Sequence, residues 1–243
     1  SPRKSKNERS ASINPKTMTS LTALPHPGLG LIKLDTLFPR LPGDLGLANS
    51  WGPHVLEAVV QGALPQLIVK QQLAFAQSAF APLFAKALQT LVQRGATAIT
   101  TSCGFLVLWQ KELQALSPVP VITSSLCLLP ELLKKESSVG VLSIDAHSLT
   151  PLHWAGAGLG PHLVRRLVVK GMPPDGHFCQ SILGNQAHLD ADQAQQEVVA
   201  AALSLVQESP QLKTLVLECT NLPPYQSAIE MATGLKVLSL RDN

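Results

Sequence analysis

The 243-residue chain is poor in charged and aromatic residues. Charged residues make up 14% and aromatic residues 4%, whereas hydrophobic residues make up 45%. This composition excludes wholesale disorder, which requires low hydrophobicity and high charge. Ten aromatic residues are too few to favour stacking on nucleic-acid bases, and 19 prolines and 16 glycines disfavour a coiled coil. The length predicts one large domain or two small ones with a sizeable core.

Cysteine and long apolar runs are also scarce. The four cysteines are too few for a disulfide scaffold. Without a C-x-x-C or H-x-x-x-H motif, no zinc site is expected. The most apolar stretch, 73–92, is interrupted by polar residues and a proline, and the N-terminus lacks the apolar core of a signal peptide. We therefore expect no metal, no membrane partner, and a cytoplasmic protein with reduced thiols.

The net charge of +3 is concentrated at the N-terminus. Residues 1–16 contain five basic residues and one acidic residue, a charge of +4, which leaves −1 for the remainder. We predict a disordered basic arm over residues 1–28 and no nucleic-acid partner. A targeting or nucleic-acid-binding arm is the alternative, and Met18 is a candidate natural start with an extension before it.

Strand-like and helix-like segments alternate along the rest of the chain. This order predicts a parallel α/β sheet with helices on both faces, in which ligands bind beyond the C-terminal ends of the strands. The predicted strands are 29–34, 57–60, 97–101, 119–123, 139–144, 163–169, 212–217 and 236–240. The predicted helices are 77–94, 104–116, 126–135, 149–155, 190–206 and 224–233.

Small polar residues follow the predicted strands. They occur at 35–36, 101–104, 123–125, 143–145 and 218–221. Cys103 and Cys219 have matching contexts: each follows a strand, precedes a glycine or a threonine–asparagine pair, and stands before a predicted helix. A helix N-terminus lowers a thiol pKa from about 8.5 towards 7, and its free amides bind a carboxylate.

Two such thiols facing one ligand could serve as the base and the acid on opposite faces of a carbon. The alternative is that they are buried cysteines that only fill space. We assign that structural role to Cys127 and Cys179. Strand alternation predicts that Glu218 points to the opposite side of its strand from Cys219, in a structural role.

At these residues the chain resembles the aspartate/glutamate/hydantoin racemase superfamily, whose members are cofactor-independent two-cysteine enzymes. The resemblance extends over about residues 29–240 and is closest to a little-characterised Asp/Glu racemase-like subgroup. The segments that carry it are 34–36, 38–44, 100–105, 123–125, 139–143 and 218–225.

The resemblance implies two pseudo-symmetric α/β lobes with the active site in the cleft between them. The expected domains are 29–122 plus 222–243 for the first lobe and 123–221 for the second. Cys103 and Cys219 become the acid/base thiols. The implied substrate-binding residues are Asp35, Thr36, Arg40, Ser102, Gly104, Thr123, Ser124, Thr220 and Asn221. No cofactor is implied, and a homodimer is the expectation at family level.

The expected function is therefore a racemase or epimerase of a small carboxylate-bearing compound, such as an amino acid or a derivative. Two departures weaken an assignment to glutamate. Thr220-Asn221 stands where glutamate racemases have Thr-His, and Asp35-Thr36 replaces the usual Asp-Ser-Gly. A decarboxylase, isomerase or lyase on the same scaffold, or a non-catalytic small-molecule binding protein, remains open.

Overall fold

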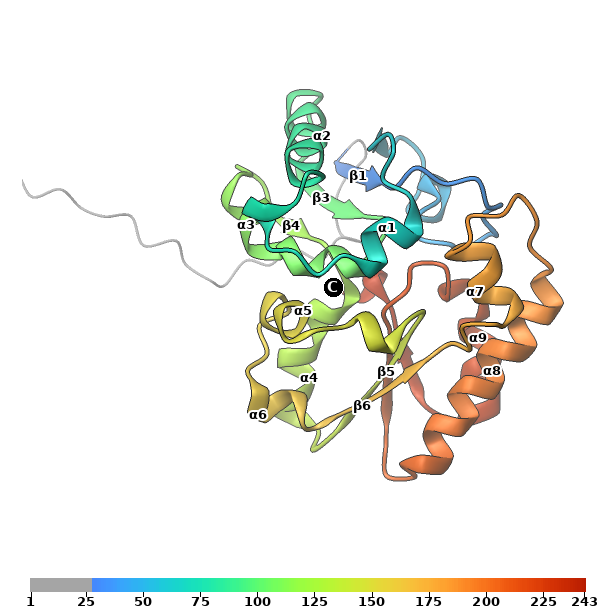
Figure 1. Ribbon diagram of the computed structural model, residues 1–243. Helices are drawn as coiled ribbons and strands as arrows, with labels where there is room; N and C mark the ends of the chain where they lie inside the picture. Colours follow the sequence, from blue (N-terminus) through green and yellow to red (C-terminus); the bar gives the residue numbers. More distant parts are fainter. Residues whose placement is uncertain (1–27) are drawn as a thin grey trace, which may run out of the picture.

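The computed structural model describes residues 28–243 and contains two four-stranded parallel sheets (Figure 1). The predicted basic arm and the candidate start at Met18 lie outside the described residues. The first sheet consists of β1 Leu29–Lys33, β2 Leu56–Val59, β3 Ala98–Thr101 and β4 Val121–Ile122. The second consists of β5 Val139–Ser143, β6 Leu167–Gly171, β7 Thr214–Leu217 and β8 Lys236–Leu238.

The two sheets repeat one topology. The strand order is β2-β1-β3-β4 in the first and β6-β5-β7-β8 in the second, and every neighbouring pair is parallel. Strands β3 and β7 therefore occupy equivalent positions, with Cys103 following one and Cys219 the other. The predicted class, two pseudo-symmetric parallel α/β lobes, is confirmed.

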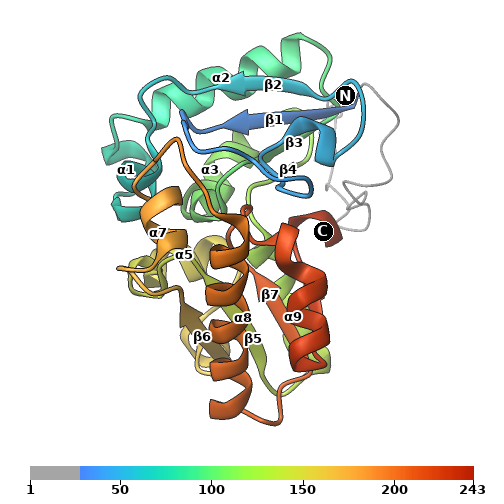
Figure 2. The ribbon, with the colours of Figure 1, turned by 90° about the vertical axis from the view of Figure 1, so that its right-hand side faces the viewer.

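Helices cover the sheets as the alternation predicts. In the first lobe α2 packs on β1 and β2, and in the second α8 and α9 cover one sheet face while α4 lies on the other side (Figures 1 and 2). No helix among residues 28–243 combines the length and the apolar character needed to span a membrane. The helices are α1 Pro65–Lys70, α2 Ala81–Gln93, α3 Gln110–Ala115, α4 Leu129–Lys135, α5 Pro151–Gly156, α6 Pro161–Val164, α7 His177–Ile182, α8 Ala191–Glu208 and α9 Gln226–Thr233.

The two lobes differ in how the predicted segments fold locally. The predicted helices at 104–116 and 126–135 each begin as a 3-10 helix, Gly104–Trp109 and Ser125–Leu128. The predicted strand 163–169 starts too early, because Pro161 begins the short helix α6 before β6. The short helices α1 and α7 were not predicted, since six residues are too few to show a helical period.

The prediction that residues 222–243 belong to the first lobe is wrong for most of this segment. Residues 222–243 were expected in the first lobe, but β8 pairs in parallel with β7 and completes the second sheet. The reason is the turn at Gly234, whose left-handed backbone ends α9 and directs the chain back along β7. Only the last residues return, and Leu240 packs against Leu29 and Ala98 of the first sheet.

The contact between α5 and the segment after Cys103 is close enough to test. A Cβ added to Gly156 would lie 2.0 Å from the backbone oxygen of Val107, an atom that cannot move away easily. We expect Gly156→Ala to lower the free energy of unfolding by roughly 1–3 kcal/mol, as overpacking does. Urea denaturation measures this change. At Gly160 the neighbour is the movable His162 side chain, so Gly160→Ala should cost less; equal losses would contradict the packing argument.

Candidate functional site

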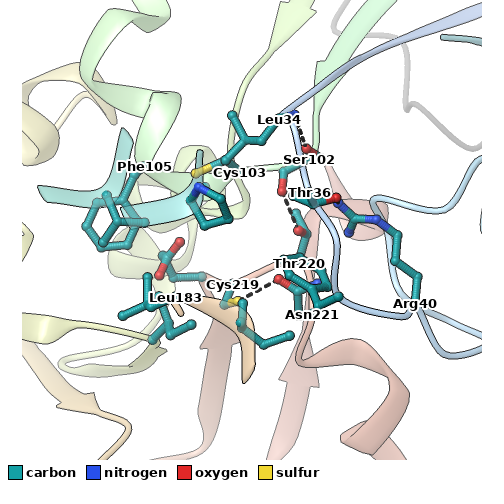
Figure 3. Close-up of a pocket in the computed structure, with 17 residues that line it drawn as sticks. Leu34, Thr36, Arg40, Ser102, Cys103, Phe105, Leu183, Cys219, Thr220 and Asn221 are labelled. Carbon is teal, nitrogen blue, oxygen red and sulfur yellow. Dashed lines mark hydrogen bonds between the residues drawn. The ribbon is translucent and has the colours of Figure 1, made fainter. Parts of the chain in front are cut away.

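A small pocket lies where the C-terminal ends of the two sheets face each other (Figure 3). Its volume is about 30 Å³, which is enough for about one or two water molecules. One part of its lining is polar: Thr36, Arg40, Ser102, Cys103, Gly104, Glu218, Cys219, Thr220 and Asn221. The rest is apolar: Leu34, Phe38, Pro65, Val69, Phe105, Ile144, Ile182 and Leu183. Because the pocket is so small, we expect the lobes to separate when a substrate enters.

The structure brings together eight of the eleven residues that the sequence pointed to. Cys103 and Cys219 line the same pocket from opposite lobes (Figure 3). They are joined there by Thr36, Arg40, Ser102, Gly104, Thr220 and Asn221. The catalytic and substrate-binding roles of these residues stay predictions, but their convergence on one small pocket is what those roles require.

The other three predicted residues lie outside the pocket lining and hold backbone in place. The Asp35 carboxylate accepts a hydrogen bond from the Gly62 N–H, at 2.9 Å. Thr123 donates its hydroxyl proton to Gln110 Oε1, at 2.6 Å, and the Ser124 hydroxyl accepts from the Leu126 N–H, at 3.1 Å. These residues fix the strand ends and the helix start that follow β1 and β4.

Burial raises the pKa of both pocket thiols. The pKa of Cys103 rises to about 12, chiefly through burial and secondly through the negative charge of Glu218, and the pKa of Cys219 rises well above its ordinary value for the same two reasons. The Cys219 thiol also donates a hydrogen bond to Asn221 Oδ1, at 3.4 Å. The expectation that helix ends lower these pKa values is therefore wrong.

The reason lies in the local backbone. Cys103 precedes a 3-10 helix of six residues, and Cys219 is followed by a turn and a three-residue 3-10 helix, Pro223–Tyr225. Neither thiol stands at the N-terminus of an α-helix, so neither gains the full macrodipole. Backbone N–H groups still act in the expected direction, because those of Phe105 and Leu106 lower the pKa of Cys103. Desolvation outweighs them.

Glu218 is a pocket residue that the sequence analysis missed. It is 2% exposed and lines the pocket beside Cys219 instead of pointing away from it. Its Oε1 accepts a hydrogen bond from the Ser143 hydroxyl, at 2.6 Å. Burial raises the pKa of Glu218 to about 7, although Ser143 and the backbone N–H of Ile144 favour the charged form. Strand alternation failed as a guide because β7 ends at Leu217, so Glu218 is no longer in the strand.

Gly104 of the first lobe lies in close contact with Glu218 of the second lobe. A Cβ on Gly104 would lie 2.3 Å from the Glu218 backbone oxygen and 2.4 Å from its Oε2. The absence of a side chain therefore lets the chain after Cys103 approach the carboxylate. A hydrogen bond also joins the two lobes: the Thr220 hydroxyl donates to the Ser102 backbone oxygen, at 2.6 Å.

Asp44 organises the other side of the site and was also not predicted. Its Oδ1 accepts from Arg40 Nη1, at 2.9 Å, and its Oδ2 accepts from Asn221 Nδ2, at 2.6 Å. Arg40 also donates to the Thr36 hydroxyl, at 3.2 Å, and its guanidinium stacks on the Phe38 ring. Arg40 is thus a buried, paired residue of the pocket wall and not a solvated loop arginine.

The relatives found by sequence comparison share one name, dimethylsulfoniopropionate lyase. No family model matches the chain. A dimethylsulfoniopropionate lyase from Durusdinium sp. clade D is 29% identical over 224 residues, which are 87% of this chain and 71% of that protein. Dimethylsulfoniopropionate lyase 3 from Emiliania huxleyi is 27% identical over 227 residues, which are 87% of this chain and 56% of the relative. The chain thus spans little more than half of the E. huxleyi protein.

Solved structures with the same fold carry other activities. A glutamate racemase from Bacillus anthracis matches with a TM-score of 0.53 and 17% identity, over 89% of this chain and 78% of that one. Arylmalonate decarboxylase matches with a TM-score of 0.54 and 13% identity, over 87% and 88%. Such identities show the fold alone, which is the two-lobe fold that the resemblance implied. These two relatives and two structural neighbours are enzymes, but the isomerase class is not confirmed, since the relatives are named lyases.

The raised pKa of Glu218 predicts a pH-dependent stability. Its pKa is about 7 in the folded chain against 4.5 when unfolded, so the folded state holds the proton more tightly. This contribution is fully present below the unfolded pKa and is lost as the pH rises through about 7, roughly 3 kcal/mol in all. We expect Glu218→Gln to become more stable relative to wild type as the pH rises from about 5 to about 8. Urea denaturation over this range measures the difference, and parallel curves would contradict an elevated pKa.

Proposed function

We propose that this chain, which has the fold of glutamate racemase and arylmalonate decarboxylase, is a lyase that eliminates a leaving group from a small carboxylate-bearing substrate. The observation that carries the proposal is the meeting of two buried thiols and a set of small hydrogen-bond donors in one pocket. Such a site can remove a proton next to a carboxylate. The lyase class is favoured over an isomerase because the curated relatives are named dimethylsulfoniopropionate lyases. A β-sulfonio carboxylate is therefore the first candidate substrate.

The polar part of the pocket suits the carboxylate. The hydroxyl groups of Thr36 and Ser102, the Gly104 N–H and the Asn221 amide all belong to the lining residues. Arg40 adds a guanidinium that Asp44 and Phe38 hold in place. Fixed donors of this kind stabilise the negative charge that develops on the carboxylate when the neighbouring carbon loses its proton.

The reaction balances without a cofactor or a second substrate. A base takes the proton from the carbon next to the carboxylate, and the electron pair of that C–H bond forms the new carbon–carbon double bond. The carbon–sulfur bond breaks, and its electron pair stays on sulfur, which leaves as neutral dimethyl sulfide. The other product is acrylate, and the base returns its proton to solvent. We assign the base to the thiolate of Cys103 or Cys219.

Elimination differs from racemisation in the number of thiols that it needs. Racemisation requires one thiol to remove the proton and a second to return a proton on the opposite face. Elimination requires a single base, because the sulfide leaves without a proton. On this proposal the two cysteines have unequal roles, although they occupy equivalent positions in the two lobes.

Substitution of each cysteine tests the proposal. With 3-dimethylsulfoniopropionate as substrate, we expect wild type to release dimethyl sulfide and acrylate. Removal of the general base costs about 10²-fold or more in rate, so either Cys103→Ser or Cys219→Ser should show that loss and the other a smaller one. Headspace gas chromatography and proton NMR measure the two products. Cys127→Ser is the matched control, since Cys127 lies outside the pocket lining, and it should retain wild-type activity.

The outcomes separate the alternatives. If Cys103→Ser and Cys219→Ser both eliminate dimethyl sulfide at the wild-type rate, the thiol mechanism is wrong. A racemase would instead show no elimination. In deuterated water it would introduce deuterium at the α-carbon of an amino acid, and this exchange would require both cysteines. A product lighter by carbon dioxide would identify a decarboxylase. Ligand binding without any turnover would leave a binding protein.

A further inference from the structure

We propose that Glu218 holds the cationic group of the substrate, so that the pocket selects zwitterions whose cation is a methylated onium group. The inference rests on the proposed function, because it places the second charge of a substrate whose carboxylate binds at the polar side. It assigns a specificity-determining role to a residue whose sequence position had suggested only a structural one.

The first argument is that Glu218 is a buried carboxylate without a cation. It is 2% exposed, and no Lys or Arg of residues 28–243 forms an ion pair with it. The Ser143 hydroxyl donates to Oε1 and the Ile144 N–H also favours the charged carboxylate, but neither group carries a positive charge, and Oε2 lies against Gly104 in the pocket lining. A buried charge is costly unless it is paired, and a cationic ligand would supply the pair.

The second argument comes from the charges around Glu218. Arg40 is paired with Asp44, and Lys70 is paired with Asp145, the acidic group whose charge further raises the pKa of Glu218. The titratable groups that face Glu218 directly are the two pocket thiols, which are neutral near pH 7 because burial raises their pKa. With Glu218 ionised, the pocket therefore has one uncompensated negative charge, which disfavours a dicarboxylate and favours a zwitterion.

The third argument concerns the kind of cation. An ammonium group has three N–H donors that need acceptors, whereas an onium group with only methyl substituents has none. Four residues of the pocket lining, Phe105, Ile144, Ile182 and Leu183, have apolar side chains without acceptors, and Ile144 gives the carboxylate a backbone N–H, which is a donor. Figure 3 shows Phe105 and Leu183 among the residues that line the pocket. Apolar walls and an aromatic ring suit methyl groups that carry a diffuse positive charge.

Binding of two matched probes tests this assignment. The first, 3-(trimethylammonio)propanoate, is an onium carboxylate without the reactive sulfonium, and the second, 4,4-dimethylpentanoate, has the same shape without the positive charge. By isothermal titration calorimetry we expect wild type to prefer the onium probe roughly tenfold or more, and Glu218→Gln to lose most of that preference. Glu136→Gln is the control, since this carboxylate accepts from Thr214 at the other end of β7, and it should keep the preference.

Proton release gives an independent readout. A cation beside Glu218 favours its charged form, so binding of the onium probe at about pH 6 should release a proton, whereas the neutral probe should not. Calorimetry in two buffers of different ionisation enthalpy measures this release, which Glu218→Gln should abolish. If that variant fails to fold, Ser143→Ala serves instead. It removes the hydrogen bond that favours the charged carboxylate, so the onium preference should appear only at higher pH than in wild type.

Failure of this inference is distinguishable from failure of the lyase proposal. Equal affinity of wild type for both probes would overturn the role of Glu218, even with elimination intact. A Glu218→Gln variant with slower elimination but an unchanged onium preference would make Glu218 a proton acceptor, which also overturns the assignment. Absence of elimination by wild type would instead refute the lyase, whatever the probes show.

Discussion

The carboxylate of Asp44 is the interaction on which the architecture of the site depends. It accepts hydrogen bonds from Arg40 in the loop after β1 and from Asn221 in the turn after β7, so one buried group joins the two lobes. Removal of one partner from a buried ion pair typically costs about 3–5 kcal/mol, because the other charge stays behind unpaired. The strand ends of both sheets are thereby held face to face, and the bond from Thr220 to Ser102 and the close approach of Gly104 to Glu218 become possible.

The packing of the two lobes also determines the chemistry of the pocket. Cys103, Cys219 and Glu218 are buried between the lobes, and burial is the largest cause of the raised pKa of each group. The pocket is therefore poor in thiolate before substrate arrives. A ligand that brings positive charge reverses part of this effect, because a nearby cation favours the ionised form of every acid around it. Substrate charge and thiol basicity are coupled in a site of this kind, and an uncharged ligand would lack that coupling.

The sequence predicted the lobes and most of the pocket for identifiable physical reasons. Strand and helix periodicity located the parallel strands, and the rule that ligands bind at their C-terminal ends located Ser102, Cys103, Cys219 and Thr220. The rule could not separate these residues from Thr123, which also follows a strand but bonds to Gln110 within its own lobe. Only the pairing of segments distant in sequence decides which strand ends meet.

The same limit explains what the sequence analysis missed. Asp44 is one of many loop residues until the fold places it against Asn221, 177 positions away. Glu218 was misplaced because alternation assumes that the strand continues, whereas β7 ends one residue earlier. The pKa values of the thiols were wrong in direction because the argument from helix ends ignored burial, and burial is a property of the assembled lobes. C-terminal residues 222–243 were placed with the wrong sheet for the same reason, since no local signal tells which strand β8 will join.

The repeated topology of the two lobes helps to explain how one scaffold can support different reactions. Two equivalent strands, β3 and β7, deliver one thiol each to opposite sides of the pocket, which is the symmetry that proton removal and return require. The electrostatic surroundings do not share that symmetry. Glu218 raises the pKa of both thiols, but Cys103 has the cation of Arg40 and the amides of Phe105 and Leu106 in its favour, whereas Cys219 has one amide, that of Asn221, and faces the further negative charge of Asp44. Unequal stabilisation of the two thiolates is unfavourable for racemisation, in which each thiol must serve as the base in one direction. It is no disadvantage in an elimination, which needs one base and releases a neutral leaving group.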